Sequence, residues 1–142
     1  MKKFFFVMMF SSSAVFACPQ MTGTYSCTGG AEPYSMDIAQ SEENGVTTYS
    51  LTIAGSVQDY IADSVARPVS ITIEGNEVPG TLATSCAENG VGTQLLTNYQ
   101  GTDVEVRDGF TISEDGSLVE VITIMTNGEP YSTETYNCTK NN

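Results

Sequence analysis

The sequence predicts an all-β fold, a small antiparallel up-and-down β-barrel of about eight to ten strands. Short runs rich in Thr, Val, Ile and Tyr alternate with turns of Gly, Asn and Asp. Neither a heptad pattern nor a long helical period interrupts this alternation. Short strands joined by tight turns are typical of a meander barrel or a β-sandwich, and the succession of hairpins favours the barrel. Closure of a barrel also removes exposed sheet edges.

Residues 1–17 have the three-part layout of a secretory signal peptide. Two lysines precede the apolar run FFFVMMF, and Val15 and Ala17 supply small residues before a cleavage site. The run is too short to span a bilayer, which needs about 20 apolar residues. We expect cleavage between Ala17 and Cys18, which leaves residues 18–142 as a single exported domain, periplasmic or secreted, without a transmembrane segment.

Cys18 would then be the first residue of the mature chain, and this opens a second interpretation. A cysteine directly after a small-residue cleavage site loosely resembles a bacterial lipoprotein signal, in which a lipid on Cys18 would anchor the protein to a membrane. The bulky Phe16 and the serines that separate the apolar run from Cys18 favour ordinary export.

The charge of the mature chain excludes some partners. Three basic residues, Arg67, Arg107 and Lys140, oppose 17 acidic ones, a formal charge of −14. Nucleic acids and anionic lipid surfaces need clustered Lys and Arg, which are absent here. A basic protein or a metal cation remains open as a partner. We expect the acidic surface to keep an exported protein soluble and monomeric.

The first half of the mature chain predicts strands with one apolar face. TGTYSCT is the first. The next two place Tyr34, Met36 and Ile38, and then Tyr49, Leu51 and Ile53, at every second position, with SEENG as the turn between them. VQDYIADSV is either a strand or one helical turn. The following strand alternates Val69, Ile71 and Ile73.

The second half predicts further strands in TLATSC, TQLLTNY, DVEVR and FTIS, followed by SLVEVITIMT and PYSTETYNCT. Asn127-Gly128 is a strong signal for a two-residue type I′ hairpin, which would pair Val119 with Tyr136. Asp115-Gly116, read in the same way, would pair Ile112 with Val119. Both turns place the same residues on one face, which we expect to line the barrel: Phe110, Ile112, Val119, Val121, Tyr136 and Cys138. We also assign Tyr25 of the first strand to this barrel-lining face.

This face is imperfect, because Glu134 also falls on it. Leu118, Ile122 and Ile124, in contrast, fall on the opposite face. A β-bulge or a partly covered outer face would explain the exceptions.

Four cysteines, Cys18, Cys27, Cys86 and Cys138, predict two disulfides in an oxidising compartment. In an up-and-down barrel with an even strand count, the first strand lies antiparallel to the last. Cys27 and Cys138 each lie near the end of their own strand, so flush antiparallel strands would hold them roughly 15–20 Å apart. This exceeds the reach of a disulfide. We therefore expect Cys18–Cys138 and Cys27–Cys86.

The inventory of reactive side chains argues against catalysis. The chain has no histidine, no Gly-x-Ser-x-Gly motif and no phosphate-binding loop. Acidic turns in SEENG, RDG and SEDG offer oxygen ligands for calcium, but Asp, Asn and Gly are also ordinary turn residues, and we favour that interpretation. Seven tyrosines could line a ligand cavity or pack in the barrel, and packing is again favoured. We expect neither an enzyme nor a cofactor.

Two short stretches resemble lipocalin-type barrels. Gly23-Thr24-Tyr25 is similar to the Gly-x-Trp start of that family, with Tyr in place of Trp, and Thr97-Asn98-Tyr99 is similar to its Thr-Asp-Tyr loop. This resemblance implies a barrel that encloses a small apolar ligand. Tyr25-Ser26-Cys27 with a late cysteine is also similar to periplasmic inhibitors of C-type lysozyme, which are small disulfide-bonded barrels.

These observations lead to one expected function and two alternatives. We expect an exported, non-enzymatic binding protein that takes a small apolar ligand inside or a protein partner on its acidic loops. The first alternative is an inhibitor of a basic exported enzyme such as lysozyme. The second is a structural envelope protein without a ligand.

Overall fold

Five two-residue turns fold the chain into successive hairpins. Each has a non-glycine residue with φ between 49° and 52°, followed by a glycine with φ between 77° and 82°. These are the dihedral signs of a type I′ turn, whose twist matches that of the flanking strands. The first residue of each pair tolerates the left-handed region, and glycine adopts it without a steric cost. The five pairs are Asn44-Gly45, Ala54-Gly55, Glu74-Gly75, Gln100-Gly101 and Asn127-Gly128.

The computed structural model describes residues 17–142, so the predicted signal segment before Ala17 lies outside the described residues. No helix long and apolar enough to cross a membrane occurs within this range. The strands are β1 (Gly23–Thr28), β2 (Tyr34–Glu43), β3 (Val46–Ile53), β4 (Ser56–Ile61), β5 (Arg67–Ile73), β6 (Asn76–Ala87), β7 (Gly90–Tyr99), β8 (Thr102–Ile112), β9 (Leu118–Thr126) and β10 (Glu129–Lys140).

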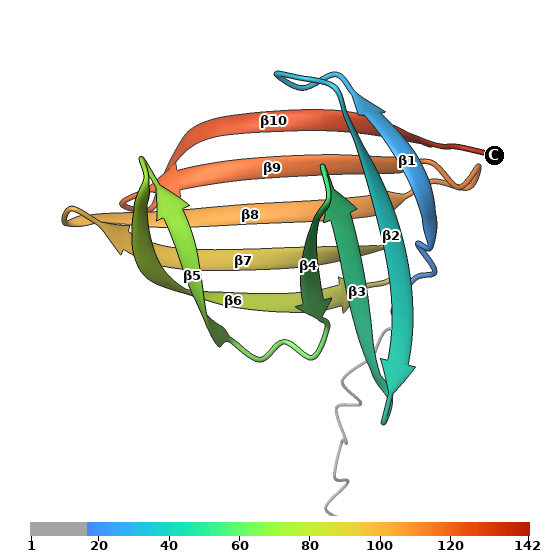
Figure 1. Ribbon diagram of the computed structural model, residues 1–142, viewed down its shortest axis with the longest axis horizontal. Helices are drawn as coiled ribbons and strands as arrows, with labels where there is room; N and C mark the ends of the chain where they lie inside the picture. Colours follow the sequence, from blue (N-terminus) through green and yellow to red (C-terminus); the bar gives the residue numbers. More distant parts are fainter. Residues whose placement is uncertain (1–16) are drawn as a thin grey trace, which may run out of the picture.

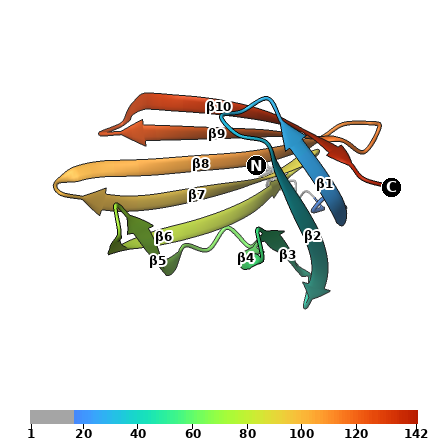
Figure 2. The same ribbon diagram turned by 45° about the horizontal axis from the view of Figure 1, so that its top comes forward.

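All ten strands belong to one antiparallel sheet with the order β4-β3-β2-β1-β10-β9-β8-β7-β6-β5. The sheet curls through 318° into a half-barrel. Strands β6–β10 run side by side along the long axis, β1–β4 cross them near one end, and β5 lies near the other end (Figure 1, Figure 2). The predicted up-and-down β fold and the antiparallel pairing of first and last strands are confirmed.

Strands β4 and β5 are the two edges of the sheet and do not pair with each other. The loop after β4 bends toward β6 instead, where the Ser64 amide donates a hydrogen bond to the Thr84 carbonyl at 2.8 Å. One end of the half-barrel is therefore closed by β1–β4 lying over β6–β9. The hydrophobic core fills this closed end, with Tyr25, Tyr49, Met21, Met36 and Leu118 fully buried.

Both disulfides differ from the predicted pairing. Cys18 is bonded to Cys86, and Cys27 to Cys138, with Cα–Cα distances of 5.2 and 3.9 Å. The prediction was wrong because it aligned β1 with the whole of β10. The short β1 pairs only with the last residues of the longer β10, so Cys27 lies directly opposite Cys138.

A pair of glycines fixes this register. Gly29 has a φ of 102°, and Gly30 lies so close to the Tyr136 ring that an added Cβ would clash with it. Strand β1 can end only where a residue without a side chain lies against the Tyr136 ring. This requirement fixes the pairing of Thr28 with Asn137.

The turn between β8 and β9 is one residue longer than predicted. Ser113 and Ser117 flank three residues, and Gly116 at the third position has a φ of 82°. This is a type I turn followed by a left-handed residue, another common hairpin connection. A shift of one residue moves every side chain to the other face. Ile112 therefore pairs with Leu118 and Phe110 with Glu120, whereas Val119 and Val121 face outward.

Of the two expected explanations for the imperfect face, a β-bulge is present, at Tyr131 in β10. It shifts the register so that Tyr136 pairs with Glu120, not with Val119. Leu118, Ile122 and Ile124 consequently face inward, as does Glu134. The uncertain segment VQDYIADSV supplies β4, and DVEVR and FTIS form one continuous strand, β8.

Candidate functional site

Two carboxyl groups face the interior from neighbouring strands. Asp108 on β8 and Glu120 on β9 are diagonal neighbours on the inner face, because Phe110 pairs with Glu120 and Asp108 pairs with Ile122. Glu120 is only 4% exposed. The Oδ1 atom of Asp108 is buried and has no hydrogen-bond partner among the described residues. Buried carboxyls without full compensation are costly, so this pair is a notable feature of the interior.

Three tyrosines surround the carboxyl pair. The Tyr34 hydroxyl at the start of β2 donates a hydrogen bond to Glu120 Oε2. The Tyr34 ring packs edge-on against Tyr136 of β10, with ring centroids 5.1 Å apart. The Tyr136 hydroxyl donates to Glu134 Oε2 at 2.9 Å. Tyr60 of β4 lines the same small interior space as Asp108.

The surroundings hold a proton on the carboxyl pair. Burial raises the pKa of Asp108 to about 8, and the negative charge of Glu120 contributes in the same direction. Burial also raises the pKa of Glu120, while hydrogen bonds to Tyr34 and Asp108 offset part of that rise. The pKa of the Tyr34 hydroxyl is raised, first by burial and then by its bond to Glu120. At neutral pH the pair is therefore not doubly charged.

The interior beside Asp108 is filled by side chains. The space left between Tyr49, Tyr60, Val91, Phe110 and their neighbours is only about 10 Å³. A ligand pocket usually needs about 300–1,000 Å³. The closed end of the half-barrel therefore has no room for a small-molecule ligand between these residues.

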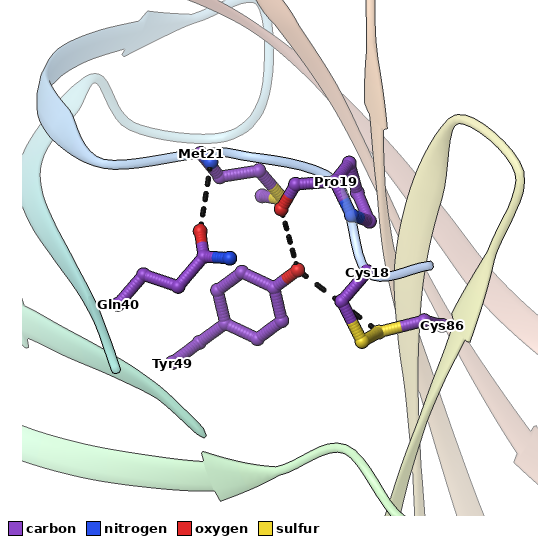
Figure 3. Close-up of a disulfide and its surroundings, with 6 residues drawn as sticks. All are labelled: Cys18, Pro19, Met21, Gln40, Tyr49 and Cys86. Carbon is purple, nitrogen blue, oxygen red and sulfur yellow. Dashed lines mark hydrogen bonds between the residues drawn. A yellow bond between two sulfur atoms is a disulfide. The ribbon is translucent and has the colours of Figure 1, made fainter. Parts of the chain in front are cut away.

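An extended segment before β1 covers the closed end (Figure 3). The Tyr49 hydroxyl donates to the Pro19 carbonyl at 2.7 Å, and the Met21 amide donates to Gln40 Oε1 at 3.0 Å. The Cys18–Cys86 disulfide attaches this segment to the end of β6. A lipid on Cys18 would need the sulfur that the disulfide uses, so the lipoprotein interpretation is incompatible with this bond. Two disulfides indicate an oxidising, extracytoplasmic environment.

At the other end of the long strands, the inner face remains partly accessible. Cross-strand pairing places Leu82, Leu95, Val106 and Ile124 in one row, and Val69 and Val104 in the next. Each of these side chains is half-buried. We call them the concave face: Val69, Leu82, Leu95, Val104, Val106 and Ile124.

Asp108 of the carboxyl pair borders the concave face. The adjoining row carries Asp108, Ile122 and Glu134, which lie between the concave face and the closed core. Polar acceptors therefore lie next to half-buried apolar side chains on one continuous inner surface. This arrangement suits a molecule with an apolar body and a polar hydrogen-bond donor.

The predicted site residues divide between the core and the outer face. Tyr25, Phe110 and Tyr136 are buried, and Ile112 is partly buried against the same core. Val119 and Val121, expected to line the barrel, lie on the outer face, where Val121 is 39% exposed.

The acidic motifs and the lipocalin-like residues lie at ordinary positions in the sheet. RDG is not a turn, since Arg107, Asp108 and Gly109 lie inside β8. SEENG and SEDG end in hairpin turns, and no group of three or more potential metal ligands forms among residues 17–142. Thr97-Asn98-Tyr99 ends β7 just before a type I′ turn, and the Thr97 hydroxyl donates to the Pro79 carbonyl at 2.8 Å.

Sequence reasoning missed Asp108 and Glu120 as interior residues. Asp108 was missed because RDG was interpreted as a turn, although Asp108 shares the period-two face of Phe110 and Ile112. The signal for Glu120 was present in Glu114-Asp115-Gly116, because glycine at the third position of a three-residue loop is typical of the observed turn. Comparison with known proteins adds no family: no protein-family model matches the chain, and no curated protein matches its sequence.

Proposed function

We propose that the protein is an exported, non-enzymatic binding module that holds an apolar molecule against the concave face. The observation that carries this proposal is the row of half-buried Leu95, Val106 and Ile124 at the end not closed by β1–β4. Half-buried apolar side chains gathered on one surface are typical of ligand or partner sites. The lipocalin-like sequence features support the same proposal, with the ligand on the concave face and not in the filled core.

The neighbouring carboxyl group gives this proposal a chemical direction. Asp108 lies in the row that adjoins the concave face, so a head group that donates a hydrogen bond would lie next to a carboxyl acceptor. The favoured ligand is an apolar molecule with a hydroxyl or amine head group. A catalytic role is disfavoured, because Glu120 is buried in side chains and the sequence has no histidine to act as a base.

A fluorescence titration with the neutral probe N-phenyl-1-naphthylamine tests the proposal. The probe should brighten on binding, and Val106→Thr should weaken binding several-fold by placing a hydroxyl on the concave face. Val57→Thr makes the same chemical change on β4, at a position that is 63% exposed, and should leave binding unchanged. The proposal fails when the wild-type protein gives no enhancement, or when both variants weaken binding equally. Failure would leave a structural envelope protein without a ligand as the better proposal.

The charge of the chain favours a second candidate, inhibition of a basic exported enzyme such as C-type lysozyme. A formal charge of −12 over the whole sequence would attract a cationic enzyme and speed encounter. A cell-wall lysis assay at low and at physiological salt tests it. Inhibition should be strongest at low salt, and no inhibition at low salt excludes this candidate. We propose the periplasm or the medium as the location of either activity.

A further inference from the structure

Strand β5 has one unpaired backbone edge. It ends the sheet and pairs only with β6. The two-residue turn at Glu74-Gly75 makes Ile73 and Asn76 a hydrogen-bonded pair. Because backbone direction alternates along a strand, Ser70 and Thr72 point their N–H and C=O groups away from β6.

A separate contact supports this assignment of direction. The Thr84 carbonyl of β6 accepts a hydrogen bond from Ser64 on the β5 side. Leu82 of β6 pairs with Arg67 of β5, and Thr84 lies two residues further along β6. The backbone N–H and C=O groups of Leu82 and Thr84 therefore point to the same side of β6. Within residues 17–142, no backbone hydrogen bond takes up the outward groups of Ser70 and Thr72.

The two sheet edges are protected to different extents. The edge strand β4 carries Asp59, and the Asp63–Arg67 ion pair at 2.6 Å joins the loop after β4 to the first residue of β5. The β5 edge has no charged residue between Pro68 and Ile73 and is rich in β-branched residues. Natural edge strands are usually blocked by charges, bulges or a covering element. Beyond Arg67, which is paired with Asp63, the β5 edge has only Pro68, which removes one donor near the start of the strand.

The side chains of β5 show what an added strand would meet. Val69 and Ile71 face the interior and are half-buried, whereas Ser70 and Thr72 are exposed. An antiparallel segment beside β5 would place every second side chain next to Val69 and Ile71. A matching segment therefore needs apolar, preferably β-branched, residues at alternate positions.

The charge distribution decides between a second copy and a different protein. Two copies would each bring a formal charge of −12 and repel one another. Glu74, in the turn directly after β5, would lie beside the start of an antiparallel partner strand, and Glu77 on β6 lies one strand further away. We propose that the β5 edge binds an extended segment of a cationic partner protein as an added antiparallel strand, with Lys or Arg preceding its apolar residues. The edge binds in this way whether or not an apolar molecule occupies the concave face.

A peptide titration on the full mature protein tests this proposal. The probe is a labelled synthetic peptide of alternating valine and threonine between pairs of lysines, followed by fluorescence anisotropy. Ser70→Pro removes an outward N–H without removing a bond to β6, so the fold should persist. The expected result is saturable binding that weakens at least about fivefold in Ser70→Pro, since one lost hydrogen bond costs about 1 kcal/mol. Val57→Pro makes the same change at an outward position of β4 and should bind like wild type.

A peptide N-methylated on the amides that would face β5 provides a second test. It keeps the charge and side chains but cannot donate to the edge, and it should bind at least about fivefold more weakly. Equal binding by both peptides, or by Ser70→Pro and wild type, would overturn the proposal in favour of nonspecific charge attraction. Absence of binding at about 1 mM peptide would overturn it as well. Sedimentation showing a wild-type dimer that Ser70→Pro abolishes would replace the cationic partner with a second copy of the chain.

Discussion

Tyr34 donates a hydrogen bond to Glu120 across the interior of the half-barrel. Their strands, β2 and β9, do not pair, because β1 and β10 lie between them in the sheet. The contact therefore joins the crossing strands β1–β4 to the long strands by side chains, independently of the backbone ladder. Tyr136, packed edge-on against Tyr34, fills the adjacent space.

Removal of the Tyr34 hydroxyl should destabilise the protein. Tyr34→Phe leaves Glu120 buried without this donor, and an unsatisfied buried acceptor costs about 1–3 kcal/mol. Urea unfolding monitored by circular dichroism should show a lower midpoint. Tyr131→Phe is the matched control, because Tyr131 is 75% exposed and should change stability little. Equal midpoints for Tyr34→Phe and the control would contradict a stabilising role for the contact.

Stability should fall as pH rises from about 4 to about 8. The pKa of Asp108 is raised to about 8 by burial, so the folded protein keeps a proton that the unfolded chain, with its ordinary pKa, has lost. Over this pH range the folded state binds more protons than the unfolded state. The free energy of unfolding therefore decreases as pH rises. Asp108→Asn mimics the protonated group and should flatten this decrease. Thermal unfolding at pH 4, 6 and 8 measures it.

The comparison of Asp108→Asn with wild type gives the expected size of this pH effect on stability. At pH 8, Asp108→Asn should be more stable by about 1–3 kcal/mol, with little difference at pH 4. Glu88→Gln, at an exposed position after β6, removes one negative charge without touching the cluster. If both variants shift the profile alike, net charge and not the buried carboxyl controls the pH dependence.

The overall fold followed from local signals in the sequence. Asn127-Gly128 predicts its hairpin because both residues accept a positive φ, and the structure has that turn. An up-and-down order with an even strand count predicts that the first and last strands are neighbours, and β1 and β10 are neighbours. The X-Gly turns at Ala54, Glu74 and Gln100 are weaker signals, because only the glycine favours the turn.

The Glu120 half of the candidate site was missed because it depends on register. One additional residue in the Glu114-Asp115-Gly116 loop exchanges the inner and outer faces of β9. Glu120, which reads as an exposed residue between two valines, thereby becomes a buried partner of Tyr34. The disulfide pairing was missed for a related reason, since the sequence does not show how much of β10 the short β1 covers.

Peptide mapping of the non-reduced protein should recover Cys18 linked to Cys86 and Cys27 linked to Cys138. Replacement of the second pair, as Cys27→Ser with Cys138→Ser, should lower the free energy of unfolding by about 2–5 kcal/mol, because this bond closes the longer loop. Replacement of the first pair releases the segment that covers Tyr49. A map with Cys18 linked to Cys138 would contradict the observed register of β1 and β10.

Gly30 should not tolerate even the smallest side chain. A Cβ there would overlap the Tyr136 ring, which is buried, packed on Tyr34 and bonded to Glu134, and so cannot move aside. Gly30→Ala should cost about 1–3 kcal/mol, as expected for overpacking. Gly109→Ala is the matched control: its Cβ would have open space, with the Val91 carbonyl oxygen 4.0 Å away. Because glycine weakens a strand interior, Gly109→Ala should be neutral or stabilising by up to about 1 kcal/mol. Equal unfolding midpoints for the two variants would show that Gly30 does not fix where β1 ends.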